Sequence, residues 1–131
     1  MKSRLIAAAF CLAILTVGCS GQGNGTVTGA VLVDGQPHGG FDVEFVSVKD
    51  GSSALGASQK DGTYELFRGR GEKLIPAGEY KVTINPTGFV EGVPMPKVKL
   101  PPTYTDANQT VIIKTIQPGE NKIDVELNTA S

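Results

Sequence analysis

The 131-residue sequence contains no tryptophan, one histidine and two cysteines, and aromatic residues make up only 6% of it. A zinc site needs several imidazole or thiolate ligands, and His38 cannot supply such a set alone. A Ser-His-Asp triad would also depend on His38, and no nucleophile motif accompanies it. Sugar sites usually rely on exposed aromatic platforms, so the shortage of tryptophan and tyrosine favours protein contact over carbohydrate contact. We therefore expect a protein that is not an enzyme and that binds no metal.

A surplus of positive charge is also missing, because 12 lysines and arginines are balanced by 13 aspartates and glutamates. Nucleic-acid binding calls for a basic stripe, so no nucleic-acid partner is expected. Glycine (17 residues) and proline (8 residues) are instead abundant in a chain that is still 40% hydrophobic. That combination is typical of strands joined by turns.

The first 19 residues have the layout of an export signal. Lys2 and Arg4 precede an apolar run over residues 5–17, which is shorter than the ~20 residues of a membrane span but suits a secretory signal. Residues 16–19, Thr-Val-Gly-Cys, resemble the lipobox of bacterial lipoproteins, although Thr16 stands where that family usually has a branched apolar residue. The resemblance implies a signal peptide over residues 1–18, cleavage before Cys19, and a covalent diacylglycerol and acyl (palmitate-type) lipid on Cys19.

Lipidation of Cys19 would decide where the protein resides. Cys11 would leave with the signal, so Cys19 would be the only cysteine of the mature chain. Two or more acyl chains hold a protein on a membrane stably, whereas one chain binds only marginally. Residues 19–25 would form the lipidated cysteine and a flexible tether. In the lipoproteins that the sequence resembles, aspartate after the cysteine favours retention at the inner membrane, so Ser20 at that position favours the outer membrane. We expect an exported, membrane-anchored lipoprotein at the outer membrane or periplasmic face; an ordinary secretory signal and an uncleaved anchor are the alternatives.

Residues 26–131 have the pattern of one all-β domain without a helical period. Turn signals recur about every 8–12 residues and separate seven short apolar or alternating segments: 26–33, 41–48, 54–59, 63–67, 76–84, 110–116 and 123–127. The alternation predicts one inward face, made of Val27, Val31, Val33, Phe41, Val43, Phe45, Tyr64, Leu66, Tyr80, Val82, Ile84, Ile123, Val125 and Leu127. We expect a seven-stranded β-sandwich.

Three positions between these segments carry strong turn signals. Asp34-Gly35 and Asp61-Gly62 suit type I′ turns, which need a positive φ at both central residues. Residues 118–121, Pro-Gly-Glu-Asn, predict a further turn before the last strand.

Three motifs within residues 25–86 resemble those of carboxypeptidase regulatory-like domains. Residues 29–37 match G-x-V-x-x-x-G-x-P, residues 61–64 match D-G-x-Y, and residues 76–82 match P-x-G-x-Y-x-V, in the family's order. Residues 102–106, Pro-Thr-Tyr-Thr-Asp, resemble part of the tail of small bacterial lipoproteins that carry this domain alone. The resemblance implies a transthyretin-like, Ig-like β-sandwich with an accessory role and no catalytic residues.

The long proline-rich segment 86–109 is the candidate recognition loop. It contains five prolines and several apolar side chains, of which Phe89, Val93, Met95 and Tyr104 are the candidate contact residues. Loops of this length in compact domains are often functional. The apolar side chains either form a recognition surface or pack over the sandwich edge and protect it from strand pairing.

The remaining polar residues give weaker signals. Arg68 and Arg70 could contact an acidic polymer, but Glu72 beside them suggests a solvated loop. Calcium needs only oxygen ligands, and single aspartates are available at Asp34, Asp42, Asp50, Asp61 and Asp106, where turn chemistry explains them better.

The sequence thus favours a non-enzymatic, lipid-anchored cell-envelope module that is structural or mediates contact with an envelope protein or polysaccharide. Two alternatives are an accessory or regulatory subunit of a separate envelope enzyme, and a β-sandwich that binds calcium or another small ligand.

Overall fold

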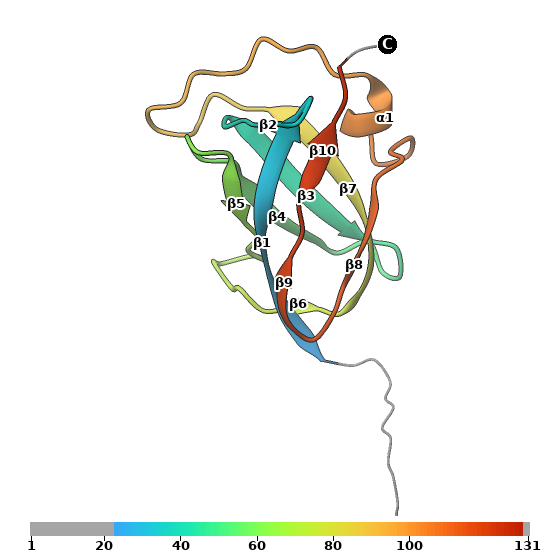
Figure 1. The fold of residues 1–131 in the computed structure, drawn as a ribbon. Coiled ribbons are helices and arrows are strands. Elements are labelled where there is room, and N and C mark those ends of the chain that lie inside the picture. The colour runs from blue at the N-terminus through green and yellow to red at the C-terminus, as the bar shows by residue number, and fades with distance from the viewer. Residues whose placement is uncertain (1–22, 130–131) are drawn as a thin grey trace, which may run out of the picture.

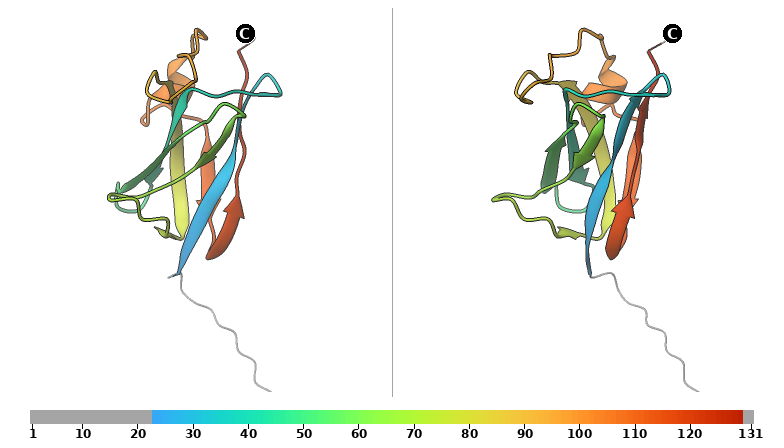
Figure 2. Two further views of the ribbon diagram at one scale, coloured as in Figure 1. Left: turned by 90° about the vertical axis from the view of Figure 1, so that its left-hand side faces the viewer. Right: turned by 60° about the vertical axis from the view of Figure 1, so that its left-hand side comes forward.

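The computed structural model describes residues 23–129, which form two β-sheets packed face to face (Figures 1 and 2). The predicted signal peptide, Cys19 and Ser20 lie outside the described residues. In residues 23–129 the only helix, α1 (Pro102–Thr105), has four residues, so this part of the chain contains no helix able to cross a membrane. The predicted all-β class and two-sheet arrangement are confirmed.

The first sheet is built around one long strand, β1 (Asn24–Val33). Along one side β1 pairs in parallel with β9 (Gly119–Lys122) and then β10 (Val125–Leu127). Along its other side it pairs antiparallel with β6 (Ile75–Pro76), β5 (Thr63–Glu65) and β2 (Gln36–Pro37). Five short partners therefore depend on a single strand for their hydrogen bonds.

The gap between β9 and β10 is closed by a side chain. Ile123 donates its backbone N–H to Thr28 O at 2.8 Å, and the Ala30 N–H donates to Asp124 Oδ1 at 3.0 Å. Asp124 thus replaces the backbone acceptor that a continuous strand would offer there. Gly29 lies at the same position because a Cβ atom would come within 1.8 Å of Ile123 O.

The second sheet is antiparallel, in the order β4 (Ser53–Ala57), β3 (Phe41–Ser47), β7 (Gly78–Pro86) and β8 (Ile113–Ile116). The β3–β7 register places Val43 opposite Ile84 and Phe45 opposite Val82. Because strand neighbours share a face, these four side chains point together into the core.

The core lies between the two sheets and matches the predicted inward face closely. The hydrophobic residues that are at most 1% exposed are Val27, Val31, Phe41, Val43, Phe45, Ala54, Leu66, Ile75, Val82, Ile84, Ile116, Val125 and Leu127. Tyr64 and Tyr80 are also buried, with their hydroxyl groups donating to Ile123 O and Pro76 O at 2.6 and 2.7 Å. Burial raises the pKa of Tyr64 well above its usual range. Ile123 is only partly buried.

The structure contains more strands than predicted and shifts several of the predicted boundaries. Each of the seven predicted segments contains a strand, but residues 23–129 also contain β2, β6 and β9, which brings the number of strands to ten. β9 occupies part of the segment predicted as a turn, because parallel pairing with β1 extends Gly119–Lys122. β8 covers only the second half of the predicted segment 110–116.

The two Asp-Gly turns differ from each other. Asp34 and Gly35 both have positive φ values, 51° and 86°, as the predicted type I′ turn requires. At Asp61-Gly62 only Gly62 has a positive φ, and its N–H donates to Gln59 O at 2.7 Å. Lys60 and Asp61 therefore form the centre of a longer turn that ends at Gly62, and the type I′ prediction is wrong here.

Candidate functional site

The connection from β7 to α1, residues 87–101, lies at one end of the sandwich, which is named the loop end (Figure 1). The Asp34-Gly35 turn and Thr129 lie at the same end, joined by hydrogen bonds from Thr129 to the Asp34 carboxylate. β1 begins at the opposite end of the sandwich, at Asn24 (Figure 1). Residues 87–101 of the candidate recognition loop and the N-terminal end of the described chain therefore lie at opposite ends of the sandwich.

The first part of the loop is attached to the body through backbone and glycine contacts. Thr87 is buried and donates its N–H to Gly40 O at 2.7 Å. A Cβ atom on Gly39 would lie 3.2 Å from Val93 Cγ1, and one on Gly40 would lie 2.8 Å from Pro96 Cδ. The missing side chains of this glycine pair let residues 93–96 approach the backbone closely.

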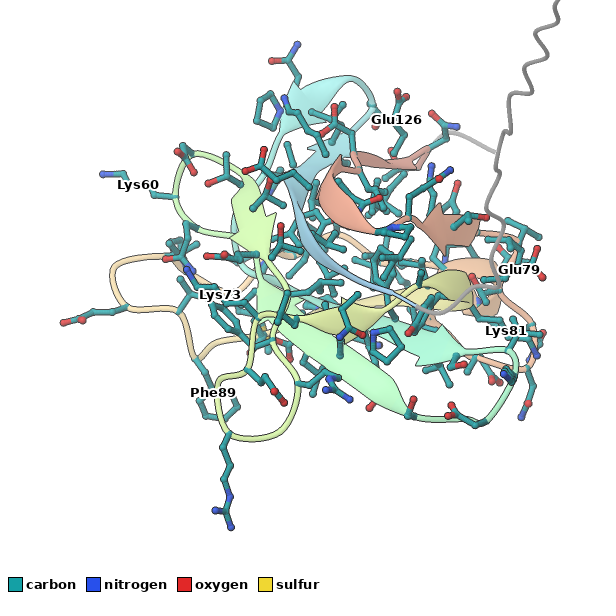
Figure 3. All side chains as sticks on the ribbon, turned by 90° about the horizontal axis from the view of Figure 1, so that it is seen from below. Lys60, Lys73, Glu79, Lys81, Phe89 and Glu126 are labelled. Carbon is teal, nitrogen blue, oxygen red and sulfur yellow. The ribbon has the colours of Figure 1, made fainter. Side chains whose placement is uncertain are left out.

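Phe89 and Met95 are exposed although the loop around them is attached. Phe89 is 96% exposed and Met95 is 54% exposed. Figure 3 shows the Phe89 side chain at the outside of the molecule. Val93, between them in sequence, is half-buried against Gly39. Among the exposed large hydrophobic residues of the described chain, Phe89 thus has the highest exposed fraction.

The later part of the connection packs onto the core. Val98, Leu100 and Tyr104 are partly buried against the core cluster. Tyr104 also accepts the Asn128 N–H on its hydroxyl oxygen at 3.1 Å, which ties α1 to the last residues of the described chain. Of the four predicted contact residues, three thus lie in the first part of the loop and Tyr104 belongs to the packed part.

Sequence reasoning missed Val98 and Leu100 as packing residues. The signal was present, because residues 97–100 read Lys-Val-Lys-Leu and alternate charged with apolar side chains. Lys97 and Lys99 are exposed, as the alternation requires.

A hollow of about 560 Å³ on the flank of the sandwich was also missed. It forms where β4 approaches β5 so closely that a Cβ on Gly56 would come within 2.2 Å of Glu65 O. Its lining includes the small side chains Thr28, Ala30, Ala57 and Thr63, the rings of Tyr64 and Phe67, and the polar residues Gln59, Glu65 and Lys122. Glu65 is paired with Lys73 at 3.4 Å, and Lys122 is exposed, so neither charged residue of the lining is a buried, unpaired charge.

The other polar residues singled out from the sequence are used within the fold. Arg68 pairs with Glu72 at 3.2 Å and donates to Leu74 O at 3.0 Å, which closes its own loop. The His38 ring meets the edge of Phe41 with ring centres 5.5 Å apart.

The aspartates considered as calcium ligands lie apart from one another. In residues 23–129 no three His, Cys, Asp or Glu side chains gather as metal ligands would. Asp50 and Asp61 each accept hydrogen bonds from the residue two positions later in their turns. These bonds lower the pKa of both carboxyl groups. Burial raises the pKa of Asp42, against the effect of a hydrogen bond with Thr87.

Comparison with protein-family models, with curated proteins and with solved structures found no match for this chain. The resemblance to carboxypeptidase regulatory-like domains therefore stays a prediction based on the three motifs.

Proposed function

We propose that this protein is a non-enzymatic, lipid-anchored module of the bacterial cell envelope that presents the loop around Phe89 to another envelope protein. The observation that carries the proposal is the 96% exposure of Phe89 at the loop end, opposite the start of β1. Burying one phenylalanine side chain in a partner contributes roughly 1.5–3 kcal/mol. A single such side chain is therefore able to serve as the anchor of a contact.

The distances along the chain support this orientation. Acylated Cys19 would be five residues from Asn24, so the tether spans at most about 17 Å when fully extended. The ten residues of β1 cover about 33 Å at the usual rise of a strand. A domain held this close to the membrane at the start of β1 has its loop end available to partners further away.

The family assignment belongs to the same proposal. The three motifs fall on the β1–β2 hairpin, on the turn into β5, and on the passage from β6 into β7. They therefore occupy turns and strand starts of a two-sheet fold, as they would in a transthyretin-like sandwich. Protein contact is favoured over polysaccharide because the most exposed aromatic side chain is a single phenylalanine without a hydrogen-bonding group.

A photocrosslinking experiment in native membranes tests the proposal. The photoreactive analogue benzoylphenylalanine replaces Phe89 in the full chain, and Leu74, which is 49% exposed elsewhere, receives the same analogue as the matched control. We expect one envelope protein crosslinked at position 89 and absent at position 74, with acyl mass on the Cys19 peptide. Phe89→Ser should abolish capture of that partner and change the free energy of unfolding by less than about 0.5 kcal/mol.

Three outcomes would overturn parts of the proposal. An unmodified Cys19 would remove the anchor. A partner captured equally well by Phe89→Ser would move recognition elsewhere on the surface. A partner that proves to be a hydrolase or peptidase whose activity changes with this chain would favour the accessory-subunit alternative.

A further inference from the structure

The two edges of the second sheet differ in whether their backbone groups are used. At the β4 edge, Leu55 and Phe67 exchange two backbone hydrogen bonds of 2.9 and 2.8 Å, which closes that edge against the segment after β5. β8 forms the opposite edge and, within the described residues, pairs only with β7.

The backbone groups of Ile113 and Thr115 point away from the sheet. Val82 donates its N–H to Ile112 O at 2.9 Å, which fixes the phase of the β7–β8 ladder. Hydrogen bonding alternates along an antiparallel pair, so Lys114 and Ile116 face β7 with their backbone groups. Ile113 and Thr115 face outward, and neither takes part in the other backbone hydrogen bonds of residues 23–129.

Exposed apolar side chains accompany this free backbone. Ile113 is 44% exposed, and Val111, two residues earlier and on the same face, is 68% exposed. An edge with free backbone groups and β-branched apolar side chains is the surface to which another strand adds. The connection from β7 to β8 packs on Gly39, Gly40 and the core. It reaches this edge at Val111, whose N–H donates to Thr103 O at 3.2 Å, and leaves the backbone of Ile113 and Thr115 uncovered.

A groove of about 350 Å³ lies between the edges β8 and β10. Its walls carry two carboxylates, Asp124 and Glu126, and one ammonium group, Lys114. Glu126 lies at the outside of the molecule (Figure 3). Asp124 already accepts the Ala30 N–H, so Glu126 is the carboxylate more available to a ligand. The charge of the groove therefore favours a basic side chain from the occupant.

We propose that the β8 edge binds an extended segment of another protein by strand addition, with apolar side chains against Val111 and Ile113 and a basic side chain toward Glu126. A second copy of this chain would be disfavoured in the antiparallel register that pairs Ile113 with Thr115, because two Lys114 side chains would lie directly opposite and like charges in that position are destabilising. A second copy also brings the same groove charges, whereas a basic segment of another protein complements Glu126. This site is separate from the Phe89 loop.

A displayed library of ten-residue linear peptides, selected on the full chain in detergent, tests the proposal. We expect selected peptides to alternate apolar and basic residues and to slow amide hydrogen exchange at Ile113 and Thr115. Thr115→Pro removes the outward N–H, a change that edge strands tolerate, and should weaken binding at least tenfold. Phe89→Ser should leave binding unchanged, which separates this site from the proposed envelope contact.

Peptides modified on the backbone keep the test valid even if Thr115→Pro fails to fold. Two versions of a selected peptide carry N-methyl groups on alternate residues, one on each edge of the peptide, with identical side chains. Strand addition predicts that one version loses binding and the other keeps it.

Equal binding by both versions, no enrichment in the selection, or protection at the Phe89 loop in place of β8 would overturn the proposal. Self-association of the full chain in sedimentation, abolished by Thr115→Pro, would also overturn it and assign the edge to a second copy.

Discussion

The chain between β7 and β8 contains two stretches that differ in the exposure of their apolar side chains to water. The first, residues 88–95, places Phe89 and Met95 in solvent while its backbone rests on a pair of glycines. The second, residues 98–104, buries Val98, Leu100 and Tyr104 partly against the core. Packing and recognition were alternatives for the whole segment when only its sequence was considered. The structure divides the segment, so that one stretch closes the end of the core and the other is free for contacts.

Breaking the glycine contact beneath the first stretch should have the largest effect. Gly40→Ala introduces a Cβ at a φ of 88°, 2.8 Å from Pro96 Cδ. The left-handed conformation costs about 1–2 kcal/mol, and the overpacking adds roughly 1–3 kcal/mol. Urea denaturation should show a free energy of unfolding that is lower by the sum of these two costs.

Gly51→Ala is the matched control for this prediction. Gly51 has a similar φ of 77°, but a Cβ there would meet nothing within 4 Å. The free energy of unfolding of Gly51→Ala should therefore fall only by the cost of the left-handed backbone conformation. Equal losses at positions 40 and 51 would show that the close approach of Pro96 contributes nothing.

Removing a packing residue of the second stretch should have an intermediate effect. Leu100→Ala should destabilise the fold by about 1–2 kcal/mol, below the 2–5 kcal/mol of fully buried leucines, because Leu100 is only partly buried. Lys99→Ala, one residue earlier and exposed, should stay within about 0.5 kcal/mol. If the lysine and leucine variants unfold at the same urea concentration, the second stretch does not stabilise the core.

The strands that could be predicted from the sequence are those whose pattern is local. Phe41, Val43 and Phe45 alternate with Asp42 and Glu44, and this period of two specifies both the strand and its buried face. The division of the long loop was also readable in part, from the charged–apolar alternation of residues 97–100. Cys19, on which the proposed anchor depends, is a local signal too, but it lies outside the described residues.

The elements that sequence reasoning missed depend on distant partners. β9 begins at Gly119 within strong turn residues, and only parallel pairing with Gly25 and its neighbours makes it a strand. The hollow on the flank of the sandwich arises from the approach of Gly56 to Glu65, and no local sequence pattern predicts that contact. The free edge of β8 likewise follows from which strand β8 pairs with.

A single hydrogen bond at the packed stretch should have a smaller effect than Leu100. Tyr104→Phe removes the acceptor of the Asn128 N–H and keeps the ring, so about 0.5–1.5 kcal/mol should be lost. Amide exchange at Asn128 should become faster, while exchange in β3 follows only the global change. Unchanged exchange at Asn128 would mean that the bond does not order the C-terminal residues.

The smallest effects should come from two aspartates that respond to pH in opposite directions. Hydrogen bonds from Thr129 lower the pKa of Asp34 below 3.8, so Asp34 stabilises the fold above that pH and loses its contribution as the pH falls further. Burial raises the pKa of Asp42 above 3.8, so Asp42 begins to oppose folding as the pH rises above 3.8 and does so fully above the raised value. Asp34→Asn, which keeps a residue that tolerates positive φ, should slightly lower the melting temperature at pH 7 and have a smaller effect at pH 2. Asp42→Asn should leave the melting temperature at pH 7 unchanged or slightly raised, and a clear fall there would mean that the bond with Thr87 outweighs the burial of the charge.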